Sequence, residues 1–174
     1  MLIPEHKNMY IDVKELNNNK NTNRAIDANI DSEDIFIGNS EVKTIDKICF
    51  SGSIRKLENI IYLEGVVTGK LSLLCSRCLE RFQYLLNIEI KEKFTQVPSE
   101  EDEYITFLDR DKINLIDLLE NNILMSLPIK KLCNEDCKGL CQQCGCNLNK
   151  KTCNCSIGNV DPRLEKLKEL FLTD

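Results

Sequence analysis

The sequence has a single histidine, His6, and lacks the short motifs that mark several large enzyme classes. No G-x-G-x-x-G, P-loop or G-x-S-x-G pattern is present. One histidine leaves no histidine-based triad or cysteine–histidine pair, and a position so near the chain end suits an exposed side chain better than a ligand. These absences favour a protein that is not an enzyme.

Long hydrophobic runs are also missing. No apolar stretch approaches the roughly 20 residues of a membrane span, and the first residues lack the basic start and apolar core of a signal peptide. We therefore expect a reducing, cytoplasmic location, where disulfides are rare. The net charge of −5 gives no general attraction for nucleic acid, so any RNA contact must be local or made through a protein partner.

Cysteine, by contrast, is abundant, with ten in 174 residues and seven of them between Cys133 and Cys155. Cys141 and Cys144 form a C-x-x-C followed by Gly145, which has the form of a zinc knuckle. Two thiolates at this spacing reach one ion from a tight turn, and the glycine lets the backbone direct amide N–H groups at the sulfurs. Cys75-Ser76-Arg77-Cys78 repeats the spacing upstream. Two C-x-x-C pairs with further cysteines nearby strongly indicate metal binding.

Alternation of apolar and polar residues predicts strands at 9–13, from about 42 to 54, at 60–74 and from 82 to 94, with a short one at 106–108. The run 82–94 alternates most cleanly, as in a half-buried antiparallel strand. The C-x-x-C then lies in the turn of a long hairpin. Gly65 and Gly69 suggest bulges or a bend, and Cys49 is expected to be a small packing residue.

The helical period begins at Asn114, a suitable N-cap, and Pro128 ends the predicted helix near Leu127. Asp161-Pro162 predicts a second, C-terminal helix that folds back as a closing element. The expected fold is α+β: an antiparallel sheet with a helix packed on it, a cysteine-rich zinc module and a C-terminal helix. Residues 1–128 form the core with the zinc-knuckle hairpin, 14–31 a solvated loop, and 129–174 the cysteine-rich module and closing helix, packed on the core as one domain.

Structural zinc takes four ligands, so eight cysteines make two sites. The preferred partition gives two ions, each held by four cysteines. The first set is Cys75, Cys78, Cys133 and Cys137, and the second is Cys141, Cys144, Cys153 and Cys155. A rival partition places the two C-x-x-C pairs around one ion and leaves the other four cysteines for the second.

Cys146 is left over in either partition. It can replace Cys144, but the glycine after Cys144 favours Cys144. Four thiolates also hold iron–sulfur clusters, so zinc is preferred without being the only choice. A dithiol redox motif is less fitting, because it begins a helix in a βαβ unit and Cys75 follows a strand.

Lysines and one arginine surround the cysteines and would offset the negative charge of two four-thiolate zinc centres. They are Arg77, Lys130, Lys131, Lys138, Lys150 and Lys151. The same side chains also suit a solvated loop, and the sequence does not choose between these interpretations.

Four stretches together resemble one protein family. They are V-V-T-G-K-L-S-L-L-C-S-R-C-L-E-R-F, L-I-D-L-L-E-N-N-I-L-M-S-L-P, C-N-E-D-C-K-G-L-C-Q-Q-C-G-C-N-L-N and D-P-R-L-E-K-L. In this order, over roughly residues 40–172, they look like the YceD family of small bacterial and plastid proteins linked to accumulation of large-subunit ribosomal RNA. Gln142 stands where a usual member has proline, and Cys146 resembles a substitution at a variable position.

The resemblance implies a role in making or stabilising 23S ribosomal RNA and supplies no catalytic residues. We therefore expect a non-enzymatic factor for large-subunit biogenesis, whose partner is the large-subunit precursor through its 23S RNA or a ribosomal protein. No membrane and no small-molecule substrate is expected. Two alternatives stay open: an iron–sulfur or thiol redox protein, and a zinc-stabilised structural adaptor for another assembly protein.

Overall fold

The computed structural model describes residues 9–17, 23–35, 37, 42–97, 105–108 and 111–155. His6, the acidic segment 99–103 and the predicted C-terminal helix lie outside these residues. Among the described residues, the contacts define two units, one of residues 9–76 and 80–133, the other of 77–79 and 134–155. No helix in the described ranges is long and apolar enough to cross a membrane.

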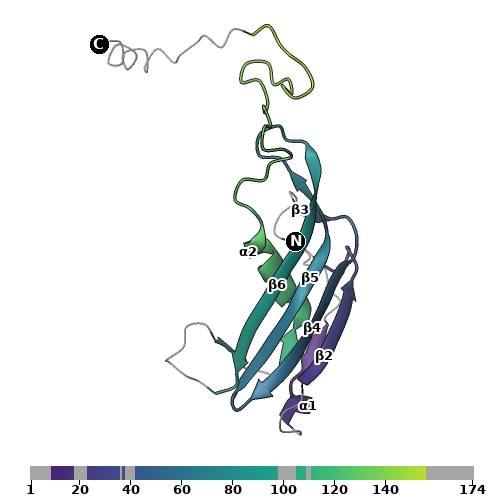
Figure 1. Ribbon diagram of the computed structural model, residues 1–174, viewed down its shortest axis with the longest axis vertical. Helices are drawn as coiled ribbons and strands as arrows, with labels where there is room; N and C mark the ends of the chain where they lie inside the picture. Colours follow the sequence, from purple (N-terminus) through teal and green to yellow (C-terminus); the bar gives the residue numbers. More distant parts are fainter. Residues whose placement is uncertain are drawn as a thin grey trace, which may run out of the picture. The chain divides into compact units, whose positions relative to one another are not determined.

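A twisted sheet forms most of the first unit (Figure 1). Its strands lie in the order β2-β4-β5-β6-β7, and β3 pairs with β5 beside them. The strands are β2 (Asn23–Ile30), β3 (Val42–Thr44), β4 (Ile48–Leu57), β5 (Ile60–Leu74), β6 (Arg81–Thr95) and β7 (Thr106–Phe107). All pairings are antiparallel except β6 with β7, which is parallel. The sheet is thus mixed at one margin, where an antiparallel sheet was predicted.

The long hairpin of β5 and β6 confirms the clearest alternation in the sequence. Its register is unbroken from Ile60 opposite Thr95 to Leu74 opposite Arg81. On β5, the residues predicted to share a face are all fully buried: Ile61, Leu63, Val67, Leu71 and Leu73. The period of two therefore placed the core face correctly, and the hairpin turn carries the first C-x-x-C as predicted.

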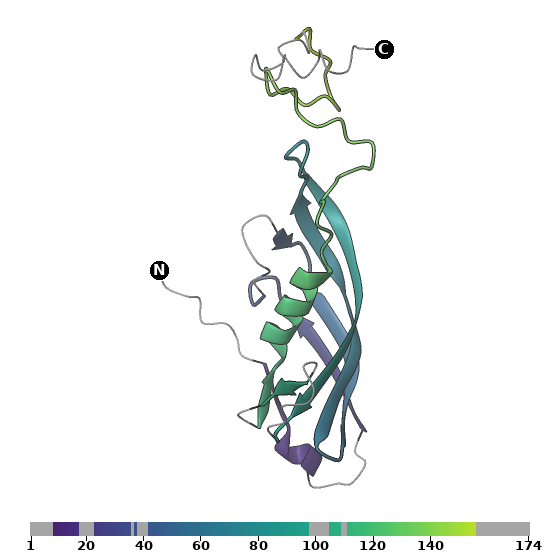
Figure 2. The same cartoon turned by 90° about the vertical axis from the view of Figure 1, so that its left-hand side faces the viewer.

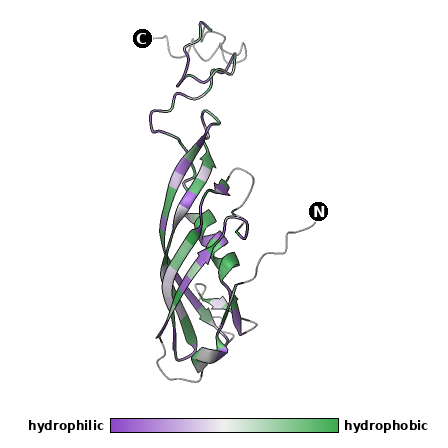
Figure 3. Cartoon of the chain, turned by 90° about the vertical axis from the view of Figure 1, so that its right-hand side faces the viewer, coloured by the Kyte–Doolittle hydropathy of each residue, from purple (hydrophilic) through white to green (hydrophobic). Residues whose placement is uncertain are grey.

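Helix α2 (Leu115–Ser126) covers the inner face of this sheet (Figure 2). The Asn114 side chain accepts a hydrogen bond from the Ile116 backbone N–H at 3.2 Å, which confirms it as the N-cap. Leu115, Leu119 and Ile123 are completely buried against the strands. The apolar side of α2 and the inward strand residues share one core, coloured green in Figure 3.

Two small elements complete the first unit. The short helix α1 is Lys14–Asn17, and a separate two-stranded sheet pairs β1 (Tyr10–Asp12) with β8 (Lys112–Asn114). This second sheet brings the predicted strand near the start of the chain against the residues that begin α2. The pairing partner lies far along the sequence, and local periodicity does not reveal it.

The predicted solvated loop at 14–31 was wrong for its second half, because residues 23–30 form strand β2. This strand pairs along its whole length with β4, from Asn23 opposite Arg55 to Ile30 opposite Ile48. Ala28 and Ile30 are buried, while the asparagine and aspartate side chains occupy the exposed face. On that face Ser51 Oγ donates a 2.7 Å hydrogen bond to Asp27 Oδ1. A strand with so few large apolar residues has a composition close to that of a loop.

Gly65 and Gly69 do not form the predicted bulges, since the β5–β6 register passes through both. Gly65 instead lies opposite Gly52 on β4, and the ring of Phe50 occupies the space where their side chains would be. A Cβ on Gly65 would lie 2.6 Å from Cε2 of Phe50, far inside van der Waals contact. The two glycines therefore serve to admit a buried aromatic ring.

Gly65→Val should destabilise the protein because the added side chain competes with Phe50 for the same space. We expect a loss of at least about 1–3 kcal/mol in the free energy of unfolding, measured by urea titration. Thr68→Val, on the exposed face of the same strand, should change it by less than about 0.5 kcal/mol. A Gly65→Val variant as stable as Thr68→Val would show that the sheet accommodates the side chain without moving Phe50.

Candidate metal centres

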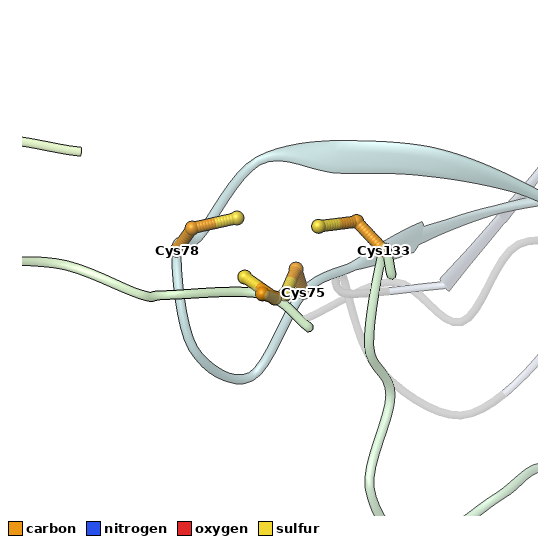
Figure 4. A group of neighbouring side chains, drawn as sticks. Cys75, Cys78 and Cys133 are labelled. Atoms are coloured by element: carbon orange, nitrogen blue, oxygen red, sulfur yellow. The ribbon is translucent and has the colours of Figure 1, made fainter. Parts of the chain in front are cut away.

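The turn between β5 and β6 presents two cysteines, and the chain leaving α2 supplies two more. The sulfurs of Cys75, Cys78, Cys133 and Cys137 all lie within 4.8 Å of one another. In Figure 4 the side chains of Cys75, Cys78 and Cys133 turn toward a common point. Cys75, Cys78 and Cys137 are buried, and Cys133 is exposed. This is the first of the two predicted cysteine sets.

Backbone hydrogen bonds hold the hairpin turn in shape. The Cys75 N–H donates to the carbonyl of Glu80 at 2.9 Å, which closes the turn. The Ser76 N–H donates to the carbonyl of Lys131 at 2.7 Å and so fixes the segment that leads to Cys133. Leu79 has a φ of +59°, a left-handed conformation that a leucine adopts only under constraint. These hydrogen bonds hold the turn in the conformation that brings Cys75 and Cys78 together, although Leu79 would not adopt that conformation by preference.

Around Cys137, polar groups support the sulfur and its backbone. The Asn149 side chain donates from Nδ2 to Cys137 Sγ at 3.3 Å, and its Oδ1 accepts from the Lys138 N–H at 2.8 Å. Arg77 Nη1 donates to the carbonyl of Cys137 at 2.9 Å. Hydrogen bonds to a ligating sulfur orient it and disperse its charge. The arginine predicted as a charge-balancing residue thus binds the backbone beside the cysteine.

The second group of four sulfurs is Cys141, Cys144, Cys153 and Cys155, again all within 4.8 Å of one another. It is the second predicted set, and the rival pairing of the two C-x-x-C motifs around one ion is not what the structure shows. Metal binding itself stays a prediction at both groups. The eight candidate ligands all come together, four in each group, within the described part of the chain.

The turn from Cys141 to Gly145 has the geometry of a knuckle. The Gly145 N–H donates to the Cys141 carbonyl at 2.9 Å, and Gly145 has a φ of +71°. The backbone N–H groups of Cys144 and Gln143 hydrogen-bond to the Cys141 sulfur and, with the Cys153 thiol, lower its pKa to about 6. The Cys146 N–H is likewise the main cause of a lowered pKa at Cys144. The turn thus favours the thiolate at both sulfurs, which is the form that binds metal.

Cys146 lies beside this group without belonging to its four. A hydrogen bond with the Cys144 sulfur, followed by desolvation, raises the pKa of Cys146 to about 12. The same neighbour raises the pKa of Cys155 to about 12. A thiolate at Cys144 opposes ionisation of the neighbouring thiols, and a bound divalent cation would reverse that effect. Cys155 is within the four-sulfur group, whereas Cys146 can remain a thiol next to it.

Cys49 differs from its predicted role. It is exposed on the outer face of β4, opposite Thr68 of β5, and does not pack in the core. Its neighbours Ile48 and Phe50 are the buried residues. The alternation placed Cys49 on the correct face but did not show that this face is open to solvent.

Each of the two groups fits a single, tetrahedrally coordinated ion. Zinc bound to four thiolates at about 2.3 Å places the sulfurs about 3.8 Å apart, within the separation observed here. The cysteine module has little else to hold it, because residues 134–155 contain no regular helix or strand, only an isolated bridge between Leu140 and Asn147. A segment this short cannot bury a core of its own, so cross-linking by metal would supply its stability.

The part of the chain that contains all eight clustered cysteines matches a known family. A family model described as large ribosomal RNA subunit accumulation protein YceD matches residues 63–171, well over half of the chain. The chain belongs to the YceD family. The resemblance noted in the sequence is thereby confirmed across the hairpin, α2 and the cysteine-rich segment, although the match begins at residue 63 and not near residue 40.

Proteins from a range of organisms are similar to this chain. The Bacillus subtilis protein YlbN is 24% identical over 85% of this chain and 88% of its own length. Rv2926c of Mycobacterium tuberculosis is 31% identical over 56% of this chain and 49% of its own length. A chloroplastic protein of Arabidopsis thaliana, named large ribosomal RNA subunit accumulation protein YCED homolog 1, is 27% identical over 62% of this chain and 43% of its own length. No solved structure matches the chain significantly.

Protein purified without added metal should be colourless and contain two zinc ions per chain, one for each four-sulfur group. Removing zinc with a strong chelator should disorder the cysteine module first, because binding and local folding are coupled. Elemental analysis and native mass spectrometry measure the content. Visible absorption typical of an iron cluster, or less than one zinc per chain, would contradict this assignment.

Cys144→Ser and Cys146→Ser form a matched pair within one turn. Cys144→Ser should lower the zinc content from two ions to one, because it removes a sulfur of the four. Cys146→Ser should leave it at two, as should Cys49→Ser on the sheet. If Cys146→Ser loses an ion while Cys144→Ser keeps both, the ligand is Cys146.

Proposed function

We propose that this protein is a non-enzymatic factor for biogenesis of the large ribosomal subunit, which acts in the bacterial cytoplasm and supports accumulation of 23S ribosomal RNA. Membership of the YceD family carries the proposal. The chloroplastic relative, whose name states large ribosomal RNA subunit accumulation, adds to it. The chain's own residues suggest how such a factor can be built.

Both cysteine groups are suited to a structural role for zinc. Four thiolates complete the coordination of zinc, so neither group keeps an open position at which the ion would activate water. The close approach of four sulfurs suits a single ion better than a cluster of several irons, whose ligands bind different metal atoms and stand further apart. The ions would then fix the backbone around them and take no part in a reaction.

The cysteine module offers exposed lysines from which a partner can be bound. Lys138, Lys150 and Lys151 are all exposed in the segment that holds the second group. Lys130 is also exposed, and Lys131 is half-buried with its carbonyl bonded to Ser76. Lysine side chains bind phosphates as point charges, and each such contact releases counterions. We propose that Lys138, Lys150 and Lys151 contact 23S RNA of the precursor, while the acidic remainder of the chain limits non-specific binding.

Cells without this protein should contain less 23S than 16S ribosomal RNA and fewer free large subunits. Restoring the wild-type chain should correct the ratio, and a variant with Lys138, Lys150 and Lys151 changed to glutamine should restore it poorly. That variant should also co-sediment less with precursor particles, with a shallower salt dependence, while keeping its zinc. RNA quantification and sucrose-gradient sedimentation provide the measurements.

A matched control is the change of Lys14, Lys43 and Lys47 to glutamine, which removes the same charge from the sheet unit. These side chains are exposed, and this variant should behave as wild type. If both triple variants restore the ratio equally, the lysines of the module do not bind the precursor. An unchanged 23S to 16S ratio in cells lacking the protein would refute the proposed function itself.

A further inference from the structure

Strand β6 lies at a margin of the large sheet (Figure 1). One side of β6 pairs with β5 along its whole length. The other side pairs with β7 only at Phe94 and Thr95. In the described ranges, no strand pairs with this side of β6 at residues 81–93. Such an edge is a template for another extended chain, because its outward N–H and C=O groups have no strand partner.

The two halves of this edge differ in charge. Lys91, Glu92 and Lys93 follow one another near the β7 end, and charged side chains of this kind discourage pairing. From Phe82 to Ile88 the strand has no charged residue, no proline and no bulge. Leu85, in the middle of this stretch, is 72% exposed on the outer face. The uncharged half thus lacks three features that protect many edge strands, namely charged side chains, proline and a bulge.

We propose that this half of β6 pairs antiparallel with the same strand of a second copy of the chain, centred on Leu85. The two-fold axis then stands perpendicular to the sheet, so residues that oppose one another come from the same face. The pairs across the axis are Arg81 with Glu89, Phe82 with Ile88, Gln83 with Asn87, Tyr84 with Leu86, and Leu85 with itself.

Charge and apolar matching select this register. Arg81 of each copy meets Glu89 of the other, which gives two opposite-charge pairs per dimer, and the two exposed leucines cover each other. Moving the centre by one residue toward the C-terminus places Arg81 opposite Lys91 and Leu85 opposite Asn87. Moving it toward the N-terminus places Arg81 opposite Asn87 and Leu85 opposite Gln83. Glu89 also pairs with Lys91 of its own strand at 3.0 Å. Opposite charges facing across strands stabilise pairing and like charges destabilise it, so of these three registers only the centred one sets Arg81 opposite an acidic residue.

The association joins two sheets into one continuous sheet through backbone hydrogen bonds. A ladder of this length buries less surface than a standard stable interface, so the dimer forms reversibly and its population rises with protein concentration. The inner face of β6 contributes Phe82, Tyr84 and Ile88, which pack only partly against the core of their own copy. Their remaining apolar surface is covered when the same residues of the second copy lie opposite.

A charge exchange tests both the partner and the register. Arg81→Glu and Glu89→Arg should each raise the dimer dissociation constant by at least about tenfold, because each places two like-charge pairs across the axis. Mixing the two variants should restore association as a heterodimer, since an acidic side chain of one variant then faces a basic side chain of the other at both pairs. The variant that carries both substitutions should also dimerise alone. Sedimentation velocity over a concentration series measures each state.

Leu85→Lys is an independent variant, which places two ammonium groups on the axis and should also prevent association. Glu58→Lys reverses a charge on an exposed side chain in the turn between β4 and β5, at the end of the sheet remote from residues 81–89, and should leave dimerisation unchanged. Circular dichroism and zinc content confirm that each variant is folded. Wild-type protein that stays monomeric at the highest concentrations, or a mixture of the two charge variants that does not form the heterodimer, would overturn the proposal.

Discussion

The unbroken hydrogen-bonded ladder between β5 and β6 is the constraint on which most of the described structure depends. Its regular register sends alternate residues of both strands to one face, and that face supplies eight of the 25 buried core residues in the described ranges. The same regularity carries the chain to a turn at a defined place, where Cys75 and Cys78 stand. A slip of one residue would expose the core face, so the position of the two cysteines is tied to burial of the apolar residues.

A second constraint, the convergence of cysteine sulfurs, applies to residues 134–155, which lie outside the apolar core. Residues 134–155 contain few buried apolar side chains, yet their backbone follows specific turns with hydrogen bonds to cysteine, asparagine and arginine groups. Sulfur atoms converge in this segment, whereas apolar side chains converge in the sheet unit. The pKa of Cys141, lowered by amide N–H groups aimed at its sulfur, shows that the backbone already favours a thiolate there.

The sequence predicted what depends on strong periodicity or on spacing. Strands β5 and β6 and the N-cap at Asn114 follow from alternation and helix-end chemistry. Ligand number gave two groups of four cysteines but left two partitions open, of which the structure shows the preferred one. Strand β2 was missed because its inward residues are small or few and its outward ones are those of loops. The role of Gly65 was missed because it depends on Phe50 of a neighbouring strand. The pairing of β1 with β8 joins distant segments, and no local pattern reports such a contact.

The two cysteine groups differ in where their members lie along the chain. All four members of the second group come from one short segment, so they can meet while the rest of the chain is still unfolded. The first group takes two members from the turn between β5 and β6 and two from the chain beyond α2, so bringing them together costs more chain entropy unless the sheet and helix hold both segments in place. The second group is therefore a local site, whose geometry depends on one short segment, whereas the geometry of the first group depends on the folded hairpin and helix.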